Sequence, residues 1–339
     1  MGLSRVDEIT IVLVSWEDPG ETVRAIESLA AARSRIPDSG PKVSLVVVDN
    51  AGGALDRPAV LALWSDAVLP VNETNRGFGP AVNQAAGVAA GDVLLLLNPD
   101  TRAEGEPFSE IARAFRARED VVAVAPRLLD GVPGPESRFQ PSGGRRLPPP
   151  GREDQFTFQL RRLPRLRDDA RELLLIDHLA PNNHARRRFR YADRDPEKPL
   201  EVEQPAGAAL AVRADAYRAV GGFDESFVPA WFEDVDLCAR LHDRGSILYW
   251  PAARFRHRGG GSSEELGYAR FLPIYYSNAI RYRRRRYGRA ARAAYRGLLA
   301  AGMLMRLVAL PLRRRFPRSR REAAVAYLRA LGVALGSKR

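Results

Sequence analysis

The first 125 residues alternate short apolar runs with amphipathic stretches, and this alternation limits the folds that are open to the chain. Apolar runs of four to six residues predict buried strands at 9–14, 43–48, 68–71, 93–97 and 121–125. Apolar residues recur at helical spacing in 22–31, 81–90 and 106–118. Strands that alternate with helices are typical of a mainly parallel sheet covered by helices, so we predict an α/β fold.

This alternation stops near residue 127 and returns near residue 207. Residues 127–203 are rich in Pro, Gly and Arg, with a weak helical pattern only at 170–176, and predict an irregular insert. Further strands are predicted at 207–212 and 247–250, and further helices at 215–220 and 233–244. We therefore expect one α/β domain over 1–270 that contains the insert, followed by a basic helical region over 271–339.

The net charge of +12 is concentrated at one end of the chain. Residues 281–339 contain 18 Lys and Arg residues and one acid, Glu322, for a net charge of +17, which leaves −5 for the first 280 residues. Such a region binds nucleic acid or an anionic membrane, or is merely solvated. Because it lacks regularly interleaved aromatic residues and the body is acidic, we do not expect nucleic acid as a partner.

Three features bear on the compartment. The single cysteine, Cys238, permits neither an intramolecular disulfide nor a cysteine metal cluster. The N-terminus reads as a first strand and not as a signal peptide. No stretch reaches the roughly 18 apolar residues of a spanning helix, and the nearest, 298–312, is short and contains Arg306. We expect a cytoplasmic protein whose surface can contact a membrane.

Two aspartates follow predicted strands, at Asp49 and Asp100. In open parallel sheets, ligands bind at the carboxyl ends of the strands. A carboxylate there can accept hydrogen bonds from a base or a ribose, or hold a metal ion beside phosphates. The alternative is that each aspartate only caps a loop or the next helix.

The run Asn75-Arg76-Gly77-Phe78-Gly79 precedes the helix predicted at 81–90. Gly77 and Gly79 allow a ligand to approach the backbone closely, and a helix N-terminus favours anions. The run is a poor dinucleotide fingerprint, because it follows the third predicted strand and Val82 stands at the last glycine position. We therefore exclude a Rossmann dehydrogenase, and the alternative is a tight turn without a ligand.

Three acids, Glu233, Asp234 and Asp236, open a predicted helix after the apolar segment 227–232. Acids in a first turn complement the helix dipole without any further function. A carboxylate in apolar surroundings, however, has a raised pKa and can serve as a general base. Asp234 and its neighbours are therefore candidates for catalysis.

His257 stands among arginines and is followed by Gly259-Gly260-Gly261-Ser262. Arginines and a glycine loop suit a diphosphate site that closes over its ligand. The alternative is a structural histidine. His178, His184 and His242 show no metal-ligand spacing and receive no role.

Together, these segments resemble the inverting family-2 glycosyltransferases with the GT-A fold, a mixed and mainly parallel α/β fold. The resemblance runs from about residue 9 to residue 262, interrupted by the insert. Its motifs occur in order along the chain: Val48-Asp49-Asn50, Asn75 to Gly79 with Asn83, Gly91-Asp92, Leu97-Asn98-Pro99-Asp100, Gly207-Ala208-Ala209, Gly221 to Glu225, Phe232 to Asp236, and His257.

The resemblance assigns roles to single residues. Asp49, with Asn75 and Gly77, would bind the nucleotide, and Asp100 would hold a divalent metal on the donor diphosphate. Asp234 matches the catalytic base, and His257 matches a metal-ligand position of some members. Asn98 stands where the family has the first acid of Asp-x-Asp, which leaves fewer protein ligands. The metal implied is Mg²⁺ or Mn²⁺. Mg²⁺ tolerates few protein ligands when phosphates supply the others, whereas an imidazole ligand such as His257 favours Mn²⁺.

Asn98-Pro99-Asp100, the Gly221 to Glu225 run and Arg138-Phe139-Gln140-Pro141-Ser142 look most like bacterial rhamnosyltransferases of cell-wall and O-antigen assembly. This would imply a dTDP-L-rhamnose donor and a polyprenyl-diphosphate-linked or polysaccharide acceptor. We expect a single displacement with inversion, in which Asp234 takes the acceptor proton.

Membrane contact and two other functions complete the predictions. Residues 298–312, with Arg292, Arg296 and Arg313 to Arg315 around them, would dock the protein on an anionic membrane. The alternative is a helical pair packed on the catalytic domain, with a solvated basic face. Two alternatives to a rhamnosyltransferase stay open for this protein. One is a transferase that uses another nucleotide-sugar, and the other is a non-catalytic GT-A-like binding protein.

Overall fold

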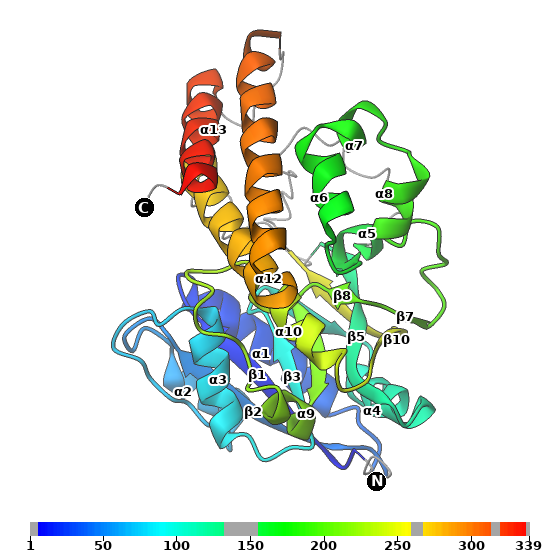
Figure 1. Cartoon of the computed structure of the whole chain (residues 1–339). Coiled ribbons are helices and arrows are strands. Elements are labelled where there is room, and N and C mark those ends of the chain that lie inside the picture. Colours follow the sequence, from blue (N-terminus) through cyan, green and yellow to red (C-terminus); the bar gives the residue numbers. More distant parts are fainter. Residues whose placement is uncertain (1–5, 132–154, 259–266, 313–318, 337–339) are drawn as a thin grey trace.

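A computed structural model describes residues 6–131, 155–258, 267–312 and 319–336 (Figure 1). Eight strands form one mixed sheet in the order β2-β1-β3-β9-β5-β10-β4, with β7 also paired to β10. Their bounds are β1 Glu8–Ser15, β2 Lys42–Asp49, β3 Val93–Leu97, β4 Thr101–Glu104, β5 Val121–Asp130, β7 Leu200–Glu201, β9 Ala209–Arg213 and β10 Ser246–His257. The pairs β1–β2, β1–β3 and β5–β10 are parallel, whereas β9, β4 and β7 run antiparallel to their neighbours.

Helices cover both faces of the sheet, which explains why its strands are apolar on both sides. Ile9, Ile11 and Leu13 of β1 lie in one core with α1 Pro19–Arg33, α2 Arg57–Leu63 and α4 Pro107–Ala117. Val12 and Val14 lie in a second core with α3 Phe78–Val88, α9 Ala214–Ala219 and α10 Glu233–Leu241. The predicted α/β fold is confirmed.

The run at 68–71 is not a strand, and that prediction is wrong. Val68 and Val71 make only isolated bridges to Val46 and Asp49 of β2, and both valines are exposed. Pro70 lies between them and has no N–H to donate to a ladder. Conversely, β4 and the second half of β10 were missed, because the four residues of β4 are mostly polar and Pro251 interrupts the pattern of β10.

The insert is more regular than predicted. Residues 127–130 belong to β5, and residues 155–203 contain four short helices, the strand β7 and the strand β6 Leu160–Arg161, which pairs with β8 Gln204–Pro205. The helices are α5 Phe156–Gln159, α6 Leu166–Leu173, α7 Ile176–Leu179 and α8 His184–Phe189. Helices of eight residues or fewer show little periodicity in a sequence. Arg138 to Ser142 lie outside the described residues.

Two helices form the C-terminal region and project from the sheet (Figure 1): α12 Tyr268–Val308, which is interrupted at Gly288 (φ 86°), and α13 Arg320–Leu335. A third core joins them to Leu173 of α6 and to Phe227 and Phe232, which precede α10. The division into 1–270 and 271–339 remains a prediction, but the two parts share this core. No helix in the described part of the chain is both long and apolar enough to span a membrane.

Three arginines of α12 form ion pairs with acids of the preceding chain. Arg283 pairs with Asp169 of α6 in the interior, Arg286 lies 2.9 Å from Asp243, and Arg285 pairs with Asp224. Burial raises the pKa of Asp169 to about 6 despite the adjacent guanidinium. Part of the positive charge of the C-terminal helices is therefore paired with acids of the preceding chain, and these ion pairs attract the helices to the body.

Candidate active site

Asp100 and His257 lie together at one edge of the sheet. Asp100 follows β3, and β4 begins at the next residue, Thr101, which pairs with His257 at the end of β10. This pairing brings His257 Nε2 to 3.4 Å from Asp100 Oδ1. Gln155 holds the ring on its other side, because its Oε1 is 3.0 Å from Nδ1 and its Nε2 donates to the His257 carbonyl at 2.9 Å.

This pair has the donor atoms of a divalent-metal site. Ligand atoms that each lie about 2.1 Å from one ion can be at most about 4.2 Å apart, and 3.4 Å fits that limit. A hydrogen bond that fixes the second ring nitrogen is the usual support of a ligating histidine. Among the described residues no three His, Cys, Asp or Glu side chains gather around one ion position. Phosphate oxygens and water would therefore complete the shell.

Asp234 lies in the first turn of α10, half-buried. Its Oδ1 accepts the Val235 N–H at 2.8 Å, and its Oδ2 accepts the Gly207 N–H at 3.2 Å. The next residue, Ala208, accepts the Asn98 N–H at 3.0 Å. Asp234 is thus tied through Gly207 and Ala208 to the segment that carries Asp100. The structure therefore brings together Asp100 and His257, and it links Asp234 to them through the backbone of Gly207, Ala208 and Asn98.

The three acids of this turn differ in state. Asp236 is buried and bound to Arg240, with its Oδ2 2.7 Å from Nη2. Burial and the charge of Asp234 raise the pKa of Glu233. Burial also raises the pKa of Asp234, opposed by the N–H groups of Val235 and Gly207. The two adjacent carboxyls therefore oppose each other's ionisation, and the two backbone N–H groups favour the ionised form at Asp234.

Asp49 and Asn75 organise the loop that follows β2. The Asp49 carboxylate is buried and accepts the N–H groups of Ala51 and Leu55 at 2.9 and 3.0 Å, as expected for a loop cap. Asn75 accepts from Asn50 Nδ2 at 2.8 Å and from the Gly77 N–H at 2.7 Å. Gly77 takes a φ of 91° at the start of α3. Nucleotide contact by Asp49, Asn75 and Gly77 remains a prediction.

Asn278 was missed from the sequence, although it binds the loop before α10 directly. Its Nδ2 donates to the carbonyls of Ala230 and Trp231 at 2.9 and 3.1 Å. Trp231 and Phe232 both have positive φ values, 71° and 74°, which are unfavourable for aromatic residues. A buried asparagine on the apolar face of α12 was the signal available, but its partner lies some 47 residues away.

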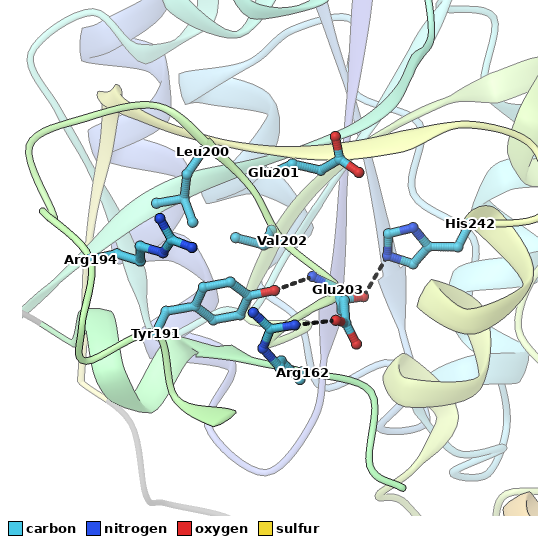
Figure 2. Close-up of a pocket in the computed structure, with 8 residues that line it drawn as sticks. All are labelled: Arg162, Tyr191, Arg194, Leu200, Glu201, Val202, Glu203 and His242. Carbon is cyan, nitrogen blue, oxygen red and sulfur yellow. Dashed lines mark hydrogen bonds and ion pairs between the residues drawn. The ribbon is translucent and has the colours of Figure 1, made fainter. Parts of the chain in front are cut away.

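A cavity of about 350 Å³ is lined in part by Tyr191, Glu203 and His242 (Figure 2). Its polar groups bind one another: Tyr191 Oη accepts the Glu203 N–H at 3.0 Å, and His242 Nε2 is 2.9 Å from the Glu203 carbonyl. Arg162 Nη1 lies 3.1 Å from the Glu203 carboxylate. None of the predicted site residues lines this cavity.

Comparison with known proteins defines the class. The model of glycosyl transferase family 2 matches residues 10–189, and the chain belongs to this family. N-acetylglucosaminyl-diphospho-decaprenol L-rhamnosyltransferase of Mycobacterium tuberculosis is 26% identical over 270 residues, 76% of this chain and 78% of that protein, in each of two strains. The family match includes Asp100 and ends before Asp234 and His257, whose roles therefore rest on geometry and on the motifs.

Two solved structures share the fold. Mannosyltransferase PcManGT from Pyrobaculum calidifontis, in complex with GDP-Man and Mn²⁺, has a TM-score of 0.51 and 16% identity over 99% of this chain and 89% of that chain. GalNAc-T7 with UDP, GalNAc and Mn²⁺ has a TM-score of 0.51 and 13% identity over 82% of this chain, which spans about half of its length (48%). The predicted GT-A fold is confirmed.

We predict that Asn278→Ala lowers kcat by about 10- to 100-fold, because small displacements of a catalytic group cost about that much. Donor binding should change little, because Asn278 contacts the loop before α10 and not the Asp100–His257 pair. Steady-state kinetics, with donor affinity from thermal shift, measures both effects.

The isostere Asn278→Asp should be as impaired as Asn278→Ala, since it keeps the shape but lacks the N–H donor. Asn183→Ala is the matched control, because Asn183 Nδ2 also donates to a carbonyl, that of Ala180 at 2.7 Å. Equal losses of kcat and donor affinity in Asn278→Ala would instead indicate general destabilisation.

Proposed function

We propose that this glycosyltransferase moves L-rhamnose from dTDP-L-rhamnose, with inversion, to a hydroxyl of a polyprenyl-diphosphate-linked acceptor in cell-envelope glycan assembly. The observation that carries the proposal is the convergence of Asp234 with the Asp100–His257 pair around Gly207 and Ala208. The mycobacterial relative, named for rhamnosyl transfer to a decaprenol-linked acceptor, supports the substrate classes. A different nucleotide-sugar remains the second candidate.

In the proposed reaction, the acceptor oxygen forms a bond to the anomeric carbon as the bond from that carbon to the diphosphate oxygen breaks. Asp234 takes the proton of the acceptor hydroxyl, and the bond electrons leave with the nucleoside diphosphate. Asp100 and His257 would hold a divalent ion, Mg²⁺ or Mn²⁺, which supplies charge neutralisation for the departing diphosphate. Gln155 keeps the imidazole turned toward Asp100.

The first test is transfer from dTDP-L-rhamnose by Asp234→Asn. We expect kcat to fall by about 10² to 10⁴, the usual contribution of a general base. In the wild type, kcat/KM should fall as the pH drops through the pKa of Asp234. Because this pKa is raised above the ordinary aspartate value, the fall should begin at a higher pH than a solvated aspartate would give.

Glu233→Gln is the control for this assignment. Burial and the charge of Asp234 raise the pKa of Glu233 and favour its neutral form, so its amide should retain most of the activity at neutral pH. A larger loss in Glu233→Gln than in Asp234→Asn would transfer the base to Glu233. Absence of both transfer and donor hydrolysis with every nucleotide-sugar would favour the non-catalytic binding protein.

Metal removal tests the role of the Asp100–His257 pair. Asp100→Ala should weaken donor binding mainly when Mg²⁺ or Mn²⁺ is present, and His257→Ala should have a smaller effect that is larger with Mn²⁺. Gln155→Leu should reproduce the His257→Ala effect in part, since it frees the ring. Thermal shift with nucleotide measures each change, and full wild-type activity in excess EDTA would remove the metal from the proposal.

We also propose that the enzyme works at the cytoplasmic face of a membrane and docks through the end of α12. Leu299 and Met303 face the third core, whereas Leu304, Met305 and Val308 are exposed. Arg306 is not free for headgroups, because it donates to the Glu172 carbonyl at 3.0 Å. The segment 298–312 thus contributes one face to packing and another to solvent, and its exposed apolar side chains can enter an interface.

Leu304→Glu/Val308→Glu should therefore reduce co-sedimentation with vesicles that contain an anionic lipid, and high salt should reduce binding of the wild type. Point variants are preferable to truncation, because α12 shares a core with Phe232 and Val235, which stand on either side of Asp234 in the chain. Val88→Glu, an exposed apolar residue on α3, is the control. Equal partitioning of all three proteins would show that the helices are only structural.

A further inference from the structure

A second cavity, of about 410 Å³, is lined by arginines of the insert. It lies between the end of β6, the start of α6 and α8. Five of its eight lining residues are arginines, and one is an acid: Arg162, Arg165, Arg167, Arg171, Arg188 and Asp168. We propose that this arginine cavity binds the diphosphate group of the acceptor, an inference that rests on the proposed function.

The charges in the arginine cavity do not balance. Asp168 lies 2.8 Å from Arg171 and 3.9 Å from Arg167, Asp177 lies 3.6 Å from Arg171, and Glu203 lies 3.1 Å from Arg162. Within the described residues no ion pair involves Arg165 or Arg188, and both are exposed to solvent. Like charges that line one cavity favour an anion between them. A diphosphate provides that anion, and guanidinium groups bind its oxygens in pairs.

Arg171 supplies an independent sign of a missing partner. Its side chain is largely buried, at 19% exposed, and its Nε makes no hydrogen bond within the described part of the chain. The Oδ1 of Asp177 lies 3.6 Å from this Nε, beyond hydrogen-bonding distance. Buried donors in native proteins are normally satisfied, so a ligand oxygen in the adjoining cavity accounts for this one.

The arginine cavity is close to the candidate base. Arg161 of β6 pairs in register with Gln204 of β8, and Gln204 Nε2 lies 3.4 Å from Asp234 Oδ2. Arg161 also lowers the pKa of Asp234 through its charge. The four residue-to-residue steps from Arg161 to Arg165 span at most about 14 Å. We therefore place the sugar of the acceptor at Asp234 and its diphosphate in the cavity.

The other end of α6 leads toward apolar surface. The eight residues of α6 rise about 12 Å and are followed by α7, where Leu179 is 82% exposed and Ile176 is also exposed. Figure 1 shows α7 and the end of α12 at the same end of the molecule. A polyprenyl chain that leaves the cavity in this direction reaches the surface proposed to dock on lipid. Sugar, diphosphate and lipid then follow one path along α6.

The test compares Arg165→Gln/Arg188→Gln with the wild type on two acceptors, a sugar on a short-chain polyprenyl diphosphate and the same sugar as a methyl glycoside. We expect the KM for the diphosphate acceptor to rise by about 10- to 100-fold, as for lost charged hydrogen bonds. The increase should be absent with the glycoside. Arg187→Gln is the matched control, because Arg187 neighbours Arg188 on α8, does not line the cavity and donates to the Ala192 carbonyl at 3.2 Å.

Equal KM values for wild type and double variant would overturn the proposal, as would an equal increase in Arg187→Gln. Calorimetry with inorganic pyrophosphate in EDTA separates this inference from the proposed function. Suppose that no acceptor is rhamnosylated, but the wild type binds pyrophosphate and the double variant does not. Diphosphate binding in the arginine cavity would then be supported, and the proposed rhamnosyl transfer would be wrong. Vesicles of anionic lipid without acceptor complete the test, because loss of vesicle binding in the double variant, without loss of pyrophosphate binding, would assign the arginines to headgroups.

Discussion

The short segment Gly207–Ala208 holds the two halves of the site together. The Gly207 amide binds the Asp234 carboxylate, and the Ala208 carbonyl binds the Asn98 amide two residues before Asp100. A Cβ on Gly207 would lie 3.3 Å from that of Asp234, so a side chain here would press on Asp234. The separation of Asp234 and Asp100 therefore depends on one backbone-to-carboxylate hydrogen bond, on one backbone-to-backbone hydrogen bond and on the absence of a side chain at position 207.

The C-terminal helices belong to the catalytic architecture as well as to the surface. Asn278 donates to the carbonyls of Ala230 and Trp231, which precede α10. The guanidinium carbon Cζ of Arg283 lies 5.3 Å from the ring centre of Phe232. Phe232 begins α10 with a left-handed backbone that side-chain packing must sustain. Helix α12 thus has two proposed roles. Its exposed end contacts lipid, and its Asn278 and Arg283 fix the segment that carries Asp234, the proposed base.

Local patterns sufficed where the chain forms apolar strands, as in β1 and β3. They failed where geometry depends on distant partners. Strand β4 has no apolar pattern, yet its pairing with β10 places His257 beside Asp100. Gln155 and Asn278 act over sequence separations of 102 and 47 residues or more. Such contacts are products of the tertiary fold, and one sequence alone does not display them.

Glu233 and Asp234 invite comparison with the two carboxyls of a glycosidase, but their placement differs. In an inverting glycosidase the acid and the base stand on opposite sides of the scissile bond, with about 6.5 to 9.5 Å between them. Here the two carboxyls belong to consecutive residues of one helical turn. In the proposed reaction the leaving group is a diphosphate, which needs charge neutralisation and no proton. Burial raises the pKa of both carboxyls, and the charge of Asp234 raises the pKa of Glu233 further, so this turn favours one negative charge over two.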